Sequence, residues 1–201
     1  MTRFSPRGVL FDMDGVLIFS TDAWFAVYND TLTLFGHAPI GREEFLKIFG
    51  NGTQADRAAY MPERSVEEID AAYRRFFADR LDRIRLNPEA PEALERLRRR
   101  GIATSLATNT NRRLAESILG RLGIAHLLAA FACADEAGAG KPNPAVVRLA
   151  AERLGLPLAD CLFVGDSRYD EEAARAAPVA FAGYRYGAAP TRIEALSEVA
   201  G

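Results

Sequence analysis

The apolar positions of the chain follow two patterns. Strand-like apolar runs occur at the start of the chain and in its second half, and helical spacing fills the segment between them. Residues 8–12 form a short apolar run that leads into two carboxylates and a glycine, which predicts a fully buried parallel strand. From residue 88 onward, apolar runs alternate with helical patterns, which predicts a parallel sheet with right-handed crossovers. The expected strands are 8–12, 102–107, 130–133, 161–164 and 178–181, and the expected helices between the later strands are 89–100, 112–122, 144–154 and 169–177.

Residues 18–87 carry only helical spacing and no convincing strand. Ser65 and Glu68 form a capping-box signature, which predicts a long helix over about 66–84. Three shorter helices are expected before it, over 21–35, over 41–49 and from 53 onward, with Ser20 or Thr21 and then Thr53 as their N-caps. We therefore expect an α/β fold with a five-stranded parallel sheet. Its core domain would comprise residues 1–17 and 88–201, with an all-helical cap domain at 18–87.

Composition narrows the class of protein. The chain has 201 residues, with 49% hydrophobic and 26% charged residues and a formal net charge of −2. This composition is typical of a globular protein and gives no reason to expect nucleic acid or an anionic membrane as a partner. No apolar run is long enough to span a membrane, and no signal peptide is evident. Cys133 and Cys161 lie in apolar runs, so we expect a cytoplasmic protein without disulfides, as a monomer or homodimer.

Polar side chains follow the predicted strands at the points where these end. Asp12 and Asp14 follow the first strand, Thr108 and Asn109 the second, and Asp166 and Asp170 the fourth, and Lys141 lies in the loop after the third. The carboxyl ends of parallel strands meet at one edge of a sheet, so these groups converge if their strands are neighbours. Lys141 and Lys47 are the two lysines of a chain that otherwise uses arginine, which suggests that a compact ammonium is needed at position 141.

This set of groups suits phosphoryl transfer. A carboxylate can attack phosphorus, a second can protonate the leaving alkoxide, and lysine and hydroxyl groups can hold the equatorial oxygens. Carboxylate and carbonyl oxygens also favour Mg²⁺, so the sequence predicts a magnesium site. Asp12 and Asp14 alone would also suit a solvated turn, which is the less favoured alternative. His37 and His126 lie apart from these motifs, and we expect them to be surface or packing residues.

Four motifs then stand in order along nearly the whole chain. They are Asp12-Met13-Asp14-Gly15, Thr108-Asn109, Lys141-Pro142-Asn143-Pro144 and Gly165-Asp166-Ser167-Arg168-Tyr169-Asp170. Together they resemble the haloacid dehalogenase-like superfamily, which implies a Rossmann-like three-layer core with a helical cap inserted after the first motif.

The resemblance implies a role for each residue of these motifs. Asp12 matches the nucleophile and a metal ligand. Asp14 matches the general acid and base, and its backbone carbonyl would also reach the metal. Thr108 and Asn109 match the groups that hold the phosphoryl group, and Lys141 matches the lysine that bridges phosphate and nucleophile. Asp166 matches a metal ligand, and Asp170 a ligand or its support. A carboxylate at position 14 argues against dehalogenase and phosphonatase activity.

The cap and the turn at residues 49–53 resemble phosphoglycolate phosphatases. Lys47 and Arg57 of the cap are candidates for binding a substrate carboxylate, although both also suit solvated helix surfaces. We expect a Mg²⁺-dependent phosphatase of a small phosphorylated metabolite, acting through an aspartyl-phosphate. A β-phosphoglucomutase-like sugar-phosphate mutase is the alternative, followed by a non-catalytic binding protein on the same fold. Phe19 and Ala177-Pro178 depart from the usual pattern of the superfamily, outside the catalytic set.

Overall fold

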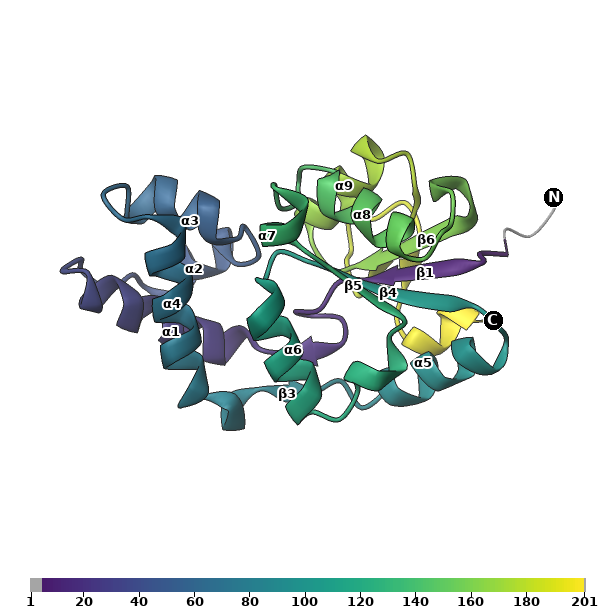
Figure 1. Cartoon of the computed structure of the whole chain (residues 1–201), viewed down its shortest axis with the longest axis horizontal. Helices are drawn as coiled ribbons and strands as arrows, with labels where there is room; N and C mark the ends of the chain where they lie inside the picture. The colour runs from purple at the N-terminus through teal and green to yellow at the C-terminus, as the bar shows by residue number, and fades with distance from the viewer. Residues whose placement is uncertain (1–4, 201) are drawn as a thin grey trace.

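The computed structural model describes residues 5–200, and its centre is a parallel β-sheet of six strands (Figure 1). The strand order is β5-β4-β1-β6-β7-β8, and every neighbouring pair is parallel. All five expected strands are present. The strands are β1 Gly8–Phe11, β4 Ala103–Thr108, β5 Ala130–Cys133, β6 Cys161–Gly165, β7 Ala180–Tyr184 and β8 Arg192–Ile193.

The predicted count of five strands is wrong because β8 was missed. This strand has only two residues, Arg192 and Ile193, and pairs with Gly183 and Tyr184 of β7. Two residues are too few to show a period of two, so the strand left no pattern in the sequence. Ile193 is nevertheless buried against the core.

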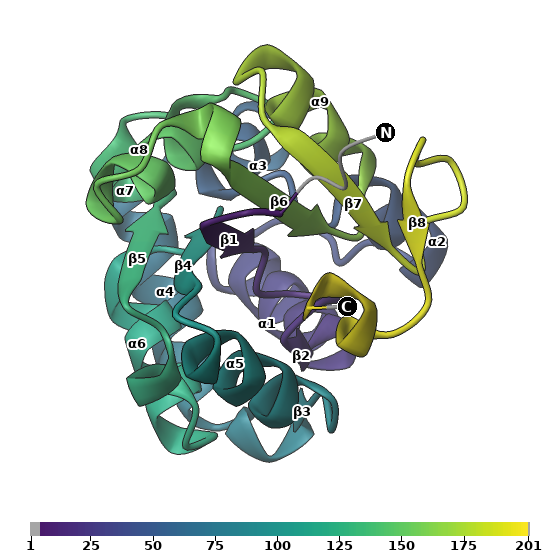
Figure 2. The same cartoon turned by 90° about the vertical axis from the view of Figure 1, so that its right-hand side faces the viewer.

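Helices cover both faces of the sheet and complete the predicted three layers (Figure 2). Val9 and Phe11 of β1 point to the face covered by α5 and α6, whereas Leu10 points to the face covered by α8 and α9. This alternation follows from the period of two along a strand, and burial on both faces explains why β1 is apolar throughout. The helices on this sheet are α5 Ala90–Arg99, α6 Arg112–Arg121, α7 Ala134–Ala137, α8 Ala145–Arg153 and α9 Arg168–Ala176, with short 3-10 turns at Leu81–Arg83, Ala125–Leu127, Leu158–Asp160 and Leu196–Ala200.

Four helices between β1 and α5 form the expected helical insert, which extends from one end of the sheet in Figure 1. Aromatic rings from three of these helices form its centre: Trp24 lies edge-on to Tyr73 and Phe77, and Tyr28 to Phe45. The capping box of Ser65 and Glu68 is confirmed. The four helices are α1 Thr21–Leu34, α2 Arg42–Ile48, α3 Thr53–Tyr60 and α4 Val66–Ala78.

Two short strands at the ends of the insert were not expected. β2, Ile18–Phe19, pairs antiparallel with β3, Arg85–Leu86, and strands of two residues again leave no sequence pattern. Because this pair brings the two ends of the insert together, we propose that residues 18–87 form a separate cap domain on a core of residues 1–17 and 88–201. Among the described residues, no helix is long and apolar enough to cross a membrane.

Candidate active site

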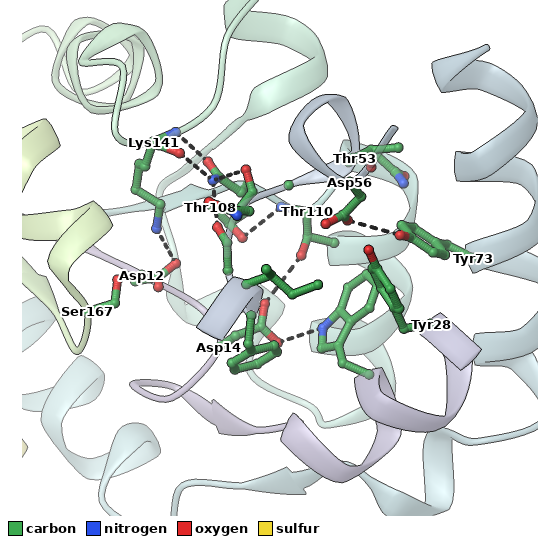
Figure 3. Close-up of a pocket in the computed structure, with 18 of the residues that line it drawn as sticks. Asp12, Asp14, Tyr28, Thr53, Asp56, Tyr73, Thr108, Thr110, Lys141 and Ser167 are labelled. Carbon is green, nitrogen blue, oxygen red and sulfur yellow. Dashed lines mark hydrogen bonds and ion pairs between the residues drawn. The ribbon is translucent and has the colours of Figure 1, made fainter. Parts of the chain in front are cut away.

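The polar residues predicted to converge lie together where three neighbouring strands end. β1 lies between β4 and β6, so Asp12, Thr108 and Asp166 come from adjacent strand ends. The Asp12 N–H donates to Val164 O over 2.9 Å, which extends the pairing of β1 with β6 to this edge. Figure 3 shows Asp12, Thr108 and Lys141 on the core side of one cavity, with Asp14 nearby and cap residues opposite.

Lys141 joins two carboxylates of this cluster. Its Nζ lies 2.6 Å from Asp12 Oδ1 and 2.7 Å from Asp170 Oδ1, and all three side chains are buried. Burial alone would lower the pKa of Lys141, but the charges of Asp12 and Asp170 outweigh it and raise this pKa, so the side chain remains an ammonium. Burial and the charge of Asp170 raise the pKa of Asp12 to about 7, against the lowering effect of Lys141.

Asp170 is fixed by the start of α9. Its Oδ2 accepts hydrogen bonds from the Ser167 hydroxyl at 2.5 Å and from the N–H groups of Ser167 and Asp166 at 3.1 and 3.2 Å. A Cβ on Gly165 would lie 2.4 Å from the Asp170 Cβ, so only glycine allows this approach. These contacts leave Oδ1 for Lys141 and orient the carboxylate toward Asp12.

Three of the four predicted metal ligands form a cluster of suitable chemistry. Asp12, Asp166 and Asp170 each place a carboxylate oxygen within 4.8 Å of the others. Burial, followed by the charges of Asp170 and Asp12, raises the pKa of Asp166 well above its usual range. One ammonium cannot balance three carboxylates that lie this close together, whereas a hard divalent cation can help to do so. A Cβ on Gly15 would lie 1.8 Å from Asp166 Oδ2, so glycine is needed beside the cluster.

Asp14 lies beside this cluster, but its side chain points to other partners. Its Oδ1 accepts hydrogen bonds from the Ser20 hydroxyl and, over 3.1 Å, from Trp24 Nε1, and its Oδ2 accepts one from the Thr110 hydroxyl over 3.3 Å. Burial raises the pKa of Asp14, against the lowering effect of these hydrogen bonds. Among the described residues, the Asp14 carboxylate does not belong to the cluster of Asp12, Asp166 and Asp170, and the predicted metal contact of its backbone carbonyl stays a prediction.

Sequence reasoning missed the groups that hold Asp14. Ser20 was expected to cap α1 with its side chain, but its hydroxyl bonds to Asp14 instead. Trp24 has the apolar spacing of the same helix, and this spacing gives no sign that its indole N–H reaches Asp14. Thr53 likewise makes no capping bond at α3 and donates to Asp70 Oδ1 over 2.6 Å. A polar side chain in the first turn of a helix can cap the helix or bond to a residue of the site. The spacing of residues in the sequence does not distinguish these two roles.

Thr108 and Asn109 occupy the end of β4 as expected. Thr108 is buried, and its Oγ1 accepts a hydrogen bond from the Thr110 N–H over 3.1 Å. Both ends of the Asn109 amide bond to the main chain: Nδ2 donates to Gly50 O at 2.8 Å and Lys141 O at 2.9 Å, and Oδ1 accepts from Lys141 N at 2.6 Å. Asn109 thus joins the cap turn to the lysine loop, and its direct contact with substrate stays a prediction.

Lys47 and Arg57 do not line the cavity. The Lys47 side chain is 69% exposed, and its Nζ pairs with Glu43 Oε1 at 3.0 Å, one turn back on α2. Arg57 donates to two main-chain oxygens beyond α3, Arg64 O at 2.6 Å and Pro62 O at 3.2 Å. The predicted role of these two cations in binding a substrate carboxylate therefore has no geometric support.

The fold agrees with comparisons to known proteins. Residues 6–178 match the haloacid dehalogenase-like hydrolase family. The chain belongs to this family of hydrolases.

Several named relatives have a similar sequence. Phosphoglycolate phosphatase 1 of Pseudomonas aeruginosa is 31% identical over 191 residues, covering 90% of this chain and 70% of that protein. The N-acetylmuramic acid 6-phosphate phosphatase of the same organism is 30% identical, covering 93% of this chain and 85% of that protein. Among solved structures, CbbY from Rhodobacter sphaeroides in complex with phosphate superimposes with a TM-score of 0.85 at 21% identity, covering 98% and 97% of the two chains. This last similarity concerns the fold alone.

Proposed function

We propose that this protein is a Mg²⁺-dependent phosphomonoesterase that hydrolyses a small phosphorylated metabolite through an aspartyl-phosphate on Asp12. The observation that carries the proposal is the bridge from Lys141 to both Asp12 and Asp170, beside the carboxylate of Asp166. Such a cluster combines a nucleophile, a cation for the phosphoryl group and a set of oxygen ligands for a metal.

Asp12 has one carboxylate oxygen held and one left for attack. Its Oδ1 accepts from the Met13 N–H at 2.7 Å and pairs with Lys141. Oδ2 accepts no hydrogen bond from the described residues, so we assign it as the oxygen that attacks phosphorus as the bond to the leaving oxygen breaks. Asp12, Asp166 and Asp170 would hold the Mg²⁺, with the Asp14 carbonyl as a further ligand. The bound ion supplies positive charge that offsets the carboxylates and the phosphoryl oxygens.

Asp14 serves both halves of the reaction. As the acid it gives its proton to the leaving alkoxide, and burial favours this protonated form. As the resulting carboxylate it takes a proton from the water that attacks phosphorus, which breaks the bond to Asp12 and releases phosphate. Thr108 uses its Oγ1 to accept from Thr110 N, so its hydroxyl proton is available to a phosphoryl oxygen, and Lys141 Nζ is available to another.

The substrate is a small-molecule phosphate ester, because the phosphate site lies inside a cavity between cap and core. We place the protein in the cytoplasm, since Cys133 and Cys161 are free and buried, as expected in a reducing compartment.

Phosphate release with and without Mg²⁺ tests this function. We expect the wild type to hydrolyse 4-nitrophenyl phosphate and alkyl phosphates, and chelation by EDTA to abolish the activity until Mg²⁺ is added back. Asp12→Asn removes the nucleophile and should lower kcat by at least about 10³-fold. Asp22→Asn, at an exposed position of the cap, is the matched control and should keep wild-type rates. A folded Asp12→Asn variant with a near-normal rate would refute the assignment of the nucleophile.

A further inference from the structure

The cap side of the cavity contains a buried carboxyl group of its own. Asp56 of α3 is 9% exposed and lines the cavity. The Tyr73 hydroxyl of α4 donates to Asp56 Oδ2 over 2.9 Å, and among the described residues nothing bonds to Oδ1. Figure 3 shows this pair on the opposite side of the cavity from Asp12. This position suits contact with the leaving group of the substrate.

A second polar group in this half of the cavity has no partner. Tyr28 of α1 is 3% exposed, and its hydroxyl forms no hydrogen bond with any described residue. In Figure 3 this hydroxyl points toward the Asp56–Tyr73 pair. A buried hydroxyl without a partner is costly, and a ligand that both accepts from Tyr28 and donates to Asp56 would relieve the cost.

The charges around Asp56 are unfavourable for an anionic ligand. Among the described residues that line the cavity, Lys141 is the only cation, and it is already paired with Asp12 and Asp170. The two cap cations considered from the sequence, Lys47 and Arg57, lie outside. A substrate carboxylate in this half would find no cation to pair with, and the ionised form of Asp56 would repel it.

A neutral hydroxyl fits these groups better than an ammonium does. A hydroxyl can donate to Asp56 Oδ1 and accept from Tyr28, whereas an ammonium has no lone pair to accept with. Burial raises the pKa of Asp56 to about 7, against the lowering effect of its bond from Tyr73. Near neutral pH Asp56 therefore carries only part of a negative charge, so it attracts an ammonium weakly and still offers a carboxylate no counterion. The rings of Trp24 and Tyr73, edge-on at 5.3 Å, supply apolar walls for carbon chains.

We propose that the cap half of the cavity selects a neutral, hydroxyl-bearing leaving group, of the polyol or sugar class, through Asp56 and Tyr28, and disfavours esters that carry a carboxylate. This inference rests on the proposed phosphatase function and names its substrate class. Phosphoglycolate, the substrate in the name of several relatives, carries a carboxylate, so the substrate proposed for this protein differs from it.

Three esters of similar length and different terminal charge test the inference. Glycerol 1-phosphate ends in a hydroxymethyl group, 3-phosphoglycerate in a carboxylate, and 3-amino-2-hydroxypropyl phosphate in an ammonium. We expect kcat/KM of the wild type to be at least tenfold higher for glycerol 1-phosphate than for either charged ester. 4-Nitrophenyl phosphate reports phosphatase activity independently of this choice.

Two variants assign the preference to the proposed groups. Asp56→Asn removes the charge and keeps an acceptor for Tyr73, so the ratio of kcat/KM between 3-phosphoglycerate and glycerol 1-phosphate should rise at least tenfold. Tyr28→Phe removes the unpartnered hydroxyl and should raise KM for glycerol 1-phosphate about tenfold, with a smaller effect on the carboxylate ester. Glu43→Gln removes a negative charge from the same cap at a 90% exposed side chain and should leave the ratio within twofold.

The outcomes separate the two proposals. Activity on 4-nitrophenyl phosphate with a preference for 3-phosphoglycerate or for the ammonium ester would overturn the inference and leave the phosphatase function standing. A ratio that Asp56→Asn does not move would also overturn it. Absence of Mg²⁺-dependent hydrolysis of all four esters by the folded protein would overturn both.

Discussion

The two halves of the cavity hold buried carboxylates in opposite ways. In the core half, Asp12 and Asp170 pair with one ammonium, Lys141, and Asp166 lies beside these two carboxylates, so the excess negative charge favours a further cation. In the cap half, Asp56 has a tyrosine hydroxyl and aromatic walls, and no described residue that lines this half is a cation. A charged site suits the phosphoryl group, which is the same in every substrate. A nearly neutral site suits the leaving group, which differs between substrates.

Changes in the core half should affect every ester, and the role of Asp14 gives the largest predicted effect. Asp14→Asn removes the proton donor and should lower kcat for alkyl phosphates about 10²–10⁴-fold. With 4-nitrophenyl phosphate, whose leaving group needs no proton, we expect about one equivalent of nitrophenolate per enzyme and then a stall, because the variant lacks the base for hydrolysis.

Stopped-flow absorbance would show this burst for Asp14→Asn. Trp24→Phe, which removes one donor to Asp14 and keeps an aromatic ring, is the milder comparison and should cost about tenfold. Steady turnover of alkyl phosphates by Asp14→Asn at the wild-type rate would contradict the acid–base assignment.

Asn109 connects the two halves, and its removal should have an intermediate effect. Asn109→Ala deletes bonds to Gly50 O and to both main-chain groups of Lys141. We expect kcat/KM to fall about 10-fold to 100-fold, and the free energy of unfolding to fall by about 1–3 kcal/mol, because these polar groups lose partners. Steady-state kinetics and urea unfolding measure both quantities. Asn143→Ala is the control, since among the described residues the Asn143 side chain bonds only to Ala145 N. Equal effects in the two variants would contradict a connecting role.

The buried carboxyl group of the cap half, Asp56, should make the free energy of unfolding depend on pH. The pKa of Asp56 is raised from 3.8 to about 7, mainly by burial. The titratable groups that face it are Tyr73, Asp70, Tyr28 and Tyr60. The folded state then binds a proton that the unfolded state has lost, so stability falls as pH rises from about 4 to 7. Between pH 5 and pH 8 the wild type should lose on the order of 2 kcal/mol relative to Asp56→Asn.

Urea unfolding of both proteins at these two pH values would measure the difference. A difference that does not change with pH would show that Asp56 is ionised in the folded protein at pH 5, and would weaken the contrast between the two halves.

The smallest effect is expected at Lys47. Its side chain is largely exposed and paired with Glu43, and exposed pairs of this kind contribute little. Lys47→Ala should change kcat/KM less than twofold for neutral and carboxylate esters alike. A tenfold loss with carboxylate esters alone would contradict this expectation and support the contact between Lys47 and a substrate carboxylate that the sequence suggested.

The same contrast explains why the core half of the site could be predicted from the sequence and the cap half could not. Asp12, Thr108 and Asp166 follow strands with clear apolar patterns, so their convergence at one edge of the sheet could be predicted. Lys141 stood out because lysine is rare in this chain. The role of Asp56 depends on which face of α3 meets α1 and α4, which is decided by packing between helices. Trp24 and Tyr28 have the spacing of core residues, and in the structure they both pack in the cap and line the cavity.

Chemical trapping tests the central claim, that Asp12 carries the phosphoryl group, most directly. The enzyme is mixed with 4-nitrophenyl phosphate and Mg²⁺, quenched during turnover and treated with borohydride, which reduces an acyl phosphate to an alcohol and leaves free carboxylates unchanged. Mass spectrometry then locates the reduced side chain. We predict reduction at Asp12 in the wild type and none in Asp12→Asn. Full turnover with no reduction at Asp12, or with reduction at Asp166 instead, would contradict the proposed mechanism.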